Sequence, residues 1–113
     1  MNSDNFKVNL SLKDTIEMLH KGIIRESSTG ERIDYHIITG DEESGAVLLV
    51  YEKYFARVSN KVTLTIVVDN LEKKTKVHSI GGGASQSVFF KFDWGASKSF
   101  TSLPREILRK YIV

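Results

Sequence analysis

The chain has 113 residues, with no cysteine and a single proline, Pro104. Without cysteine the protein has no disulfide, no thiol nucleophile and no thiolate ligand for a metal, so its stability depends on packing alone. No stretch approaches the roughly 20 apolar residues that span a bilayer, and the N-terminus lacks the basic and apolar regions of a signal peptide. We therefore expect a cytoplasmic protein with no membrane-bound part.

Blocks of like charge are also missing. The 16 basic and 14 acidic residues give a formal net charge of +2, and the two signs are interspersed along the chain. A nucleic-acid interface needs lysine and arginine gathered on one surface, so we expect no nucleic-acid partner. The densest basic run, Lys73, Lys74 and Lys76, directly follows Glu72 and is typical of a solvated turn at the end of a strand.

The composition itself is that of an ordinary globular protein, with 41% hydrophobic and 27% charged residues. A chain of this length can bury one core but not two, which predicts a single domain over residues 1–113.

The first third of the chain predicts a strand and then a helix. Phe6 and Val8 alternate with polar residues, as in a short half-buried strand. Ser11 followed three places later by Asp14 is typical of a helix N-cap. The small polar residues at 27–30 should end the helix. Its buried stripe is predicted by apolar residues at helical spacing: Leu12, Ile16, Leu19 and Ile23.

From residue 31 onward the period becomes alternating, which predicts antiparallel strands joined by polar turns at residues 40–45, 59–60 and 69–70. In the first of these strands Ile33, Tyr35 and Ile37 should form one buried face. The strand that begins at residue 46 is apolar on both faces, so we expect it to be central or covered on both sides. In the next strand the predicted core residues are Val62, Leu64, Ile66 and Val68, before a final strand at 74–80.

The C-terminal residues predict a second helix, because apolar residues recur there at helical spacing. A proline inside a helix costs about 3 kcal/mol, whereas a proline at the first position costs nothing. We therefore expect this helix to begin near residue 102, just before Pro104. The whole pattern predicts an α+β fold, a two-layer sandwich in which an antiparallel sheet of four to five strands carries an N-terminal-half helix and a C-terminal helix on one face.

The most conspicuous motif is the run IGGGASQSVFFKFDWG at residues 80–95. It is neither a P-loop, because no glycine-lysine pair follows, nor a dinucleotide fingerprint, because Gln86 stands in place of the third glycine. Consecutive glycines can still offer backbone N–H groups to an anion, although they also serve bulges and sharp bends. The candidate ligand-binding residues are Gly81, Gly82, Gly83, Ser85, Gln86 and Trp94.

No catalytic or metal-binding signature is present, and no cofactor is indicated. His20, His36 and His78 fall on the predicted first helix and on two different strands, without a second ligand at metal spacing, and we expect the two strand histidines on the solvent side of the sheet. A hydrolase that uses Ser85 or Ser87 would need a histidine within hydrogen-bond reach.

Three segments resemble a known family: Val50–Tyr54 (VYEKY), Asn60–Leu64 (NKVTL) and Gly81–Gly95. Over nearly the whole chain the sequence is similar to a family of small, mostly Gram-positive bacterial proteins known only as a domain of unknown function. The resemblance implies a single-domain cytosolic protein and supplies no functional residues. Pro104 departs from the family's pattern.

Two functions therefore remain as hypotheses. The first is a non-catalytic module that binds a small molecule, an anion or a partner through residues 81–94. The second is a self-associating structural or interaction protein. It is suggested by the two-sided apolar strand around residues 47–51 and by Val67, because helices on one face would leave the other face of the sheet for a homodimer.

Overall fold

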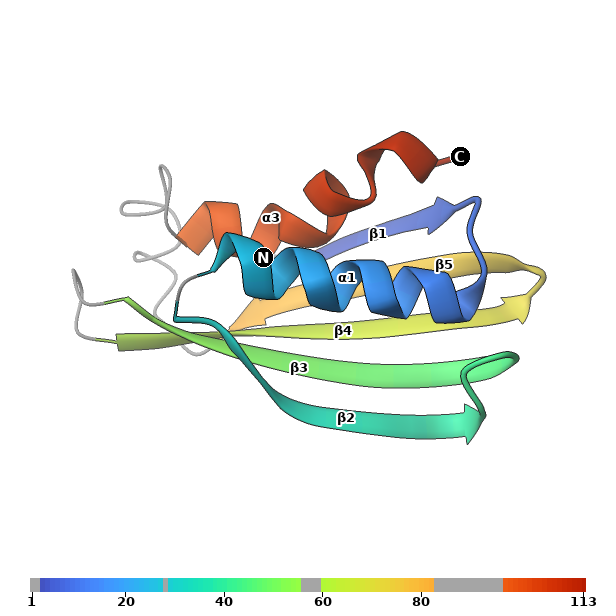
Figure 1. Ribbon diagram of the computed structural model, residues 1–113, viewed down its shortest axis with the longest axis horizontal. Coiled ribbons are helices and arrows are strands. Elements are labelled where there is room, and N and C mark those ends of the chain that lie inside the picture. The colour runs from blue at the N-terminus through green and yellow to red at the C-terminus, as the bar shows by residue number, and fades with distance from the viewer. Residues whose placement is uncertain (1–2, 28, 56–59, 83–96) are drawn as a thin grey trace.

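The computed structural model describes residues 3–27, 29–55, 60–82 and 97–113. In this part of the chain a five-stranded antiparallel sheet carries two helices on one face, which confirms the expected α+β fold (Figure 1). Neither of these helices is long and apolar enough to cross a membrane. The elements are β1 (Ser3–Val8), α1 (Leu12–Glu26), β2 (Glu31–Gly40), β3 (Gly45–Phe55), β4 (Asn60–Glu72), β5 (Lys74–Gly82), α3 (Ser97–Ile107) and the 3-10 turn η2 (Arg109–Tyr111).

Helix α1 begins and is buried as the sequence predicts. The Ser11 hydroxyl accepts a hydrogen bond from the Asp14 amide at 3.0 Å, which satisfies one of the amides that a helix start leaves unpaired. The helix ends at the predicted polar cluster, with Ser27 as the C-cap. The whole predicted stripe is buried, with exposed fractions of 4% or less: Leu12, Ile16, Leu19 and Ile23.

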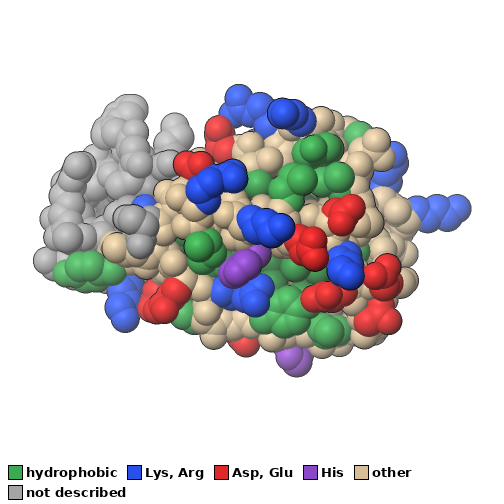
Figure 2. All heavy atoms as spheres, in the orientation of Figure 1, with side chains coloured by type: hydrophobic (Ala, Val, Ile, Leu, Met, Phe, Trp, Pro, Cys, Tyr) green, Lys and Arg blue, Asp and Glu red, His purple; other side chains and the backbone are tan. Residues whose placement is uncertain are grey.

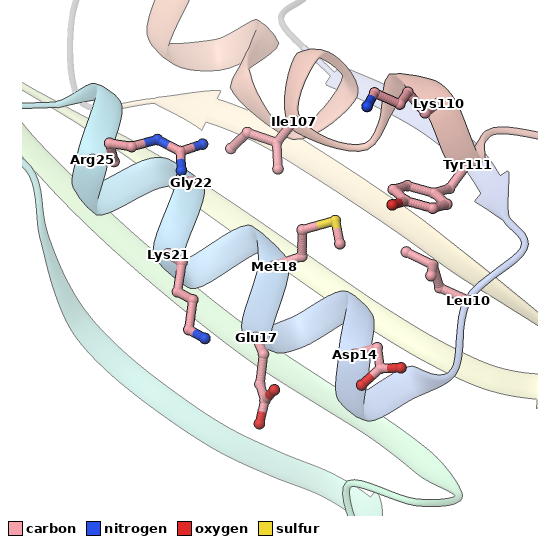
Figure 3. A pocket seen from close by; sticks show the side chains of 10 residues that line it. All are labelled: Leu10, Asp14, Glu17, Met18, Lys21, Gly22, Arg25, Ile107, Lys110 and Tyr111. Atoms are coloured by element: carbon pink, nitrogen blue, oxygen red, sulfur yellow. The ribbon is translucent and has the colours of Figure 1, made fainter.

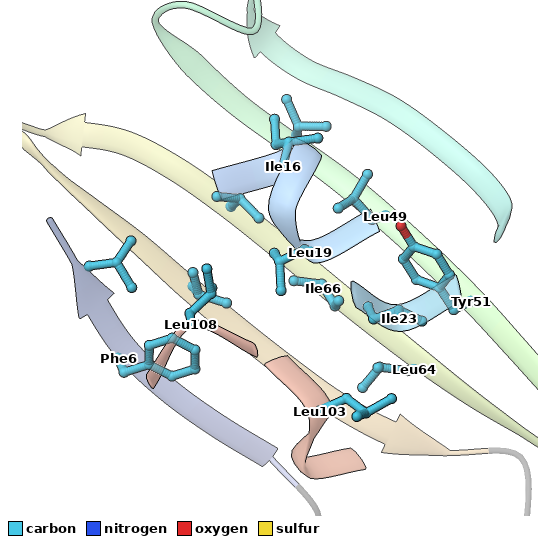
Figure 4. Close-up of a cluster of buried hydrophobic side chains, with 14 of the residues drawn as sticks. Phe6, Ile16, Leu19, Ile23, Leu49, Tyr51, Leu64, Ile66, Leu103 and Leu108 are labelled. Atoms are coloured by element: carbon cyan, nitrogen blue, oxygen red, sulfur yellow. The ribbon is translucent and has the colours of Figure 1, made fainter. Parts of the chain in front are cut away.

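The sheet has the order β1-β5-β4-β3-β2, so β3 is an interior strand, as its two apolar faces indicated. Helix α1 packs over β4, while α3 packs over β5 and β1. Between the layers lies one apolar core (Figure 4), in which each fully buried aliphatic side chain contributes about 1.5–3 kcal/mol. The strand residues that alternation predicted for this core are fully buried: Val62, Leu64, Ile66 and Val68.

The two helices touch at Gly22. A Cβ atom added at this position would lie 2.6 Å from Cδ1 and 2.9 Å from Cγ2 of Ile107 on α3. Real Cβ atoms do not approach other carbons so closely, so the missing side chain is what lets α3 lie against α1. The glycine that lowers the local helix propensity therefore serves the packing of the two helices.

The outer edges of the sheet differ. At the β1 edge, Val8 forms a bridge with Ile112, and the amide of Val113 donates to the Lys7 carbonyl at 3.0 Å. The C-terminal residues thus cover this edge. At the other edge, within the described residues, β2 pairs with β3 alone.

The burial expected for β2 is wrong. Ile33 is 50% exposed and Ile37 39% exposed, and only Tyr35 is half-buried. Tyr35 and Ile37 are in register with the buried Leu49 and Val47, but neither helix reaches far enough across the sheet to cover this edge strand, and Ile33 has no partner on β3 because the register skips it. Register shifts between Arg32 and Asp34 and between Ile37 and Thr39 further bend the strand.

Two boundaries also differ from those expected. Helix α3 begins at Ser97 rather than near residue 102, so Pro104 lies inside it and cannot donate to the carbonyl four residues earlier. The packing of Phe100 and Leu103, which are 1% and 7% exposed, offsets that cost. Strand β4 runs past the predicted turn at residues 69–70 and ends before Lys73, which has a positive φ of 79°.

Candidate functional site

A groove of about 410 Å³ lies between α1 and the C-terminal helical residues (Figure 3). We call it the α1–α3 groove. Its volume lies at the lower end of the range of small-ligand sites. The groove is lined by four apolar residues, two acidic and three basic residues, and one glycine: Leu10, Met18, Ile107, Tyr111, Asp14, Glu17, Lys21, Arg25, Lys110 and Gly22.

The charged side chains are not spread evenly around this groove. In Figure 3 Arg25 reaches across Gly22 toward α3, and Lys110 extends back toward Ile107, so two cations flank the apolar side chain of Ile107. Glu17 and Lys21 point away from α3. Asp14 lies at the other end of the groove, eleven residues from Arg25, or about 16 Å along the helix.

The two cations beside Ile107 are little compensated. Arg25 approaches only its exposed neighbour Glu26, at 3.6 Å, and Lys110 forms no salt bridge with a described residue. Exposed ion pairs such as the first are worth little and leave the guanidinium available to another partner. This end of the groove therefore combines an apolar floor with unneutralised positive charge.

A second, smaller groove of about 280 Å³ lies on the other side of α1, against β2. At its floor the His20 Nδ1 lies 2.8 Å from the hydroxyl of Tyr51, whose side chain is fully buried. Arg32 from β2 stacks over the Tyr35 ring, 4.8 Å from its centroid, and its charge acts on the same hydroxyl. Acidic and basic side chains are interspersed over this helical face of the molecule, with apolar patches between them (Figure 2).

The His20–Tyr51 contact is a hydrogen bond whose donor depends on the tautomer of the imidazole. Burial lowers the pKa of the His20 imidazole below its usual 6.5, and the charge of Arg32 lowers it further. Burial likewise raises the pKa of Tyr51. At neutral pH both side chains are uncharged and serve as a polar link between α1 and the sheet.

The glycine motif is only partly described. Gly81 and Gly82 are the last residues of β5 and pair with Leu64 and Thr63 of β4. A Cβ atom at Gly82 would lie 3.3 Å from the Thr63 hydroxyl oxygen, so this glycine permits a close strand contact. Neither glycine lines either groove. The other candidates lie outside the described residues: Gly83, Ser85, Gln86 and Trp94, with Ser87.

The histidines lie where the sequence suggested. His36 and His78 are exposed and stand in register with Leu48 and Val67, on the sheet face opposite the helices. His20 lies on α1, and its contact with Tyr51 was not foreseen. Within residues 3–27, 29–55, 60–82 and 97–113, no three histidine, aspartate or glutamate side chains gather closely enough to hold a metal ion.

The sequence did not identify the α1–α3 groove. The two cations beside Ile107 are Arg25 and Lys110, which are far apart in the sequence and meet only because α3 folds back over α1. The one local signal was Gly22 within a helical stripe, which indicates a close approach by another element.

Comparisons with known proteins give a family without a function. A family model described as "Family of unknown function (DUF6054)" matches residues 1–112. No curated protein is significantly similar to the chain. Among solved structures, a DUF4468 family protein from Bacteroides ovatus ATCC 8483 is similar at 19% identity with a TM-score of 0.36, over 69% of this chain and 50% of that one. The present chain thus spans half of that protein, and the similarity is too weak to carry an inference. The match over nearly every residue shows that the chain belongs to the DUF6054 family.

Proposed function

We propose that the protein is a non-catalytic binding module whose ligand is a small amphipathic anion. The observation that supports this is the α1–α3 groove, where Arg25 and Lys110 flank the apolar side chain of Ile107. Ligand sites typically combine an apolar lining with a few polar groups that fix orientation. An apolar chain resting on Met18 and Ile107 would place a carboxylate or phosphate between the two cations.

A pair of ligands with the same chain and different head groups tests this proposal. Octanoate carries an anion, whereas 1-octanol does not. At about ten times its Kd, octanoate should raise the free energy of unfolding by about 1.4 kcal/mol, which raises Tm by about 5 °C. The Arg25→Gln/Lys110→Gln double variant should lose this response, as measured by thermal unfolding.

The matched control is Lys13→Gln, which removes one charge from the exposed surface of α1 outside the groove. It should respond to octanoate as the unmodified chain does. Equal stabilisation by octanol and octanoate would rule out recognition of the anion. No response to either compound, or to octyl phosphate, would rule out the groove as a site for this ligand class.

Self-association through the open sheet face is a second candidate function. On the side away from the helices, Leu48, Val50 and Val67 are half-buried side by side, and Ile80 is 38% exposed. An apolar strip of this kind suits a second copy of the chain. Val67→Lys should then lower the dimer fraction in sedimentation experiments. A chain that stays monomeric at high concentration would count against this function.

Residues 81–94 would form an additional ligand site, and mass-spectrometric footprinting of Trp94 with and without ligand would test it. The resemblance supports a cytoplasmic protein of mostly Gram-positive bacteria, which fractionation of a native host would check. A hydrolase using Ser85 or Ser87 is the least supported reading, and a nucleophile-directed probe would label one of these serines if it held.

A further inference from the structure

The outer edge of β2 is a long, exposed strand edge of the described chain. The strand is ten residues long, and every residue except Tyr35 is exposed. It carries three of the exposed large apolar side chains: Ile33, Ile37 and Ile38. Proteins usually blunt a long edge strand by cover, by lysine or proline, or by bulges. Here two bulges are present, but they leave a regular stretch, Asp34–Ile37, between them.

The sequence of this stretch is chemically symmetric about Tyr35. On either side of Tyr35 stand Asp34 and His36, an acid and a base, and beyond them Ile33 and Ile37. Asp34 and His36 are in register with Val50 and Leu48 and lie on the open face, whereas Tyr35 is in register with the buried Leu49. A two-fold axis through Tyr35 would therefore place Asp34 opposite His36 on the open face and bring the two Tyr35 side chains together on the helical face.

We propose that β2 pairs antiparallel with β2 of a second copy of this chain, in a register centred on Tyr35. In that register Asp34 of each copy lies opposite His36 of the other copy, so the pair occurs twice. The two Tyr35 side chains are neighbours on the helical face. Cross-strand pairs of opposite charge and of aromatic rings are among those that stabilise antiparallel pairing.

The surroundings of His36 favour this partner. The β3 residues next to it on the open face are apolar, namely Leu48 and Val50, and the acidic residue beside it on the same face of its own strand is Asp34. The regular stretch is short, and the bulges bend the strand at both ends. The expected dimer is therefore a weak one. Pairing of the two β2 edges would join the two five-stranded sheets into one continuous ten-stranded sheet.

The register makes a charge-exchange experiment decisive. Asp34→Lys places a lysine opposite His36, and His36→Asp places an aspartate opposite Asp34, so each variant alone has two like-charged pairs. When the two variants are mixed, both pairs become opposite in charge. Sedimentation equilibrium should show association of each variant weakened about tenfold or more and association of the mixture restored.

Lys7→Glu is the matched control, because it reverses a charge on β1 at the other edge of the same face. It should associate as the unmodified chain does. A monomeric unmodified chain at about 1 mM would overturn the proposal, as would a mixture that fails to associate. Dissociation by Val67→Lys but not by Asp34→Lys would assign dimerisation to the open face instead.

The absence of cysteine offers a second readout that does not depend on charge. Tyr35→Cys introduces the only thiol, and the proposed axis brings the two copies of position 35 within disulfide reach. Mild oxidation should give a disulfide-linked dimer, and Lys7→Cys should not. Equal cross-linking of both variants would show that contact at β2 is not specific.

Discussion

At one edge of the sheet, β1 has six residues. The C-terminal segment and α3 both lie against this strand, and its Phe6 side chain packs into the core. At the other edge, β2 has ten residues, and the described chain supplies it with a single neighbouring strand. Both strands show the same alternation in the sequence. The two strands differ in which other elements cover them. We therefore expect β1 to unfold together with the core, whereas β2 should add little to the stability of the fold.

We expect the largest effect on the free energy of unfolding when one apolar side chain from each edge strand is removed. Phe6 is 7% exposed, so Phe6→Ala should lower the free energy of unfolding by about 3–5 kcal/mol. Ile33 on β2 is 50% exposed, so Ile33→Ala should cost about 0.5 kcal/mol or less. Urea unfolding at a concentration where the chain is monomeric measures both. Similar losses for the two variants would show that β2 is buried in solution.

The same contrast explains what the sequence could predict. Fold class, the start of α1 and the core face of β4 were predicted because local signals coincide there: the Ser11 cap, one helical stripe and the alternation of apolar residues in a strand rich in β-branched side chains. In β2 the alternation of Ile33, Tyr35 and Ile37 was equally clear, yet it could not say whether a helix would cover that face. Strand order and helix placement are set by contacts between distant parts of the chain.

The candidate sites were harder to predict for a related reason. Arg25 and Lys110 become neighbours through the packing of α3 on α1, and proline propensity misplaced the start of α3. Tertiary burial of Phe100 overrode the local cost of Pro104. The glycine motif gave the strongest local signal, and its described part, Gly81 and Gly82, belongs to a strand rather than to a groove.

We expect an intermediate effect on the free energy of unfolding from a change at the contact between α1 and α3. Gly22→Val would place new methyl groups where the Ile107 side chain already lies, so it should cost about 1–3 kcal/mol despite removing a glycine from the helix. Because the cost comes from one contact, Ile107→Ala in the same chain should recover part of it, and a double-mutant cycle should show a clear coupling energy.

The control for this cycle is Lys13→Val, on the exposed side of α1, which changes helix propensity without meeting α3. Its cost should be no more than about 0.5 kcal/mol, and it should add independently to Ile107→Ala. Additive costs for Gly22→Val and Ile107→Ala would mean that the close approach of the two helices does not limit their packing.

The smallest effect concerns the ion pair that ties α3 to β1. Arg105 donates two hydrogen bonds of 2.8 Å to the carboxylate of Asp4 and stacks over Phe6, 4.9 Å from the ring centroid. Those hydrogen bonds from Arg105 hold the pKa of Asp4 below its usual 3.8. The side chains are 46% and 31% exposed, so solvent screens the pair and Arg105→Gln should cost about 0.2–1 kcal/mol at pH 7.

The pH dependence of that cost identifies the ion pair as its source. Because folding lowers the pKa of Asp4, the contribution of the pair is complete above pH 3.8 and is lost as the pH falls further and the carboxylate becomes protonated in the folded chain. The difference in unfolding free energy between the unmodified chain and Arg105→Gln should therefore shrink in acid, and Asp4→Asn should abolish its pH dependence. A difference that stays constant in acid would instead assign the cost to lost stacking on Phe6, and β1 would then be held by packing alone.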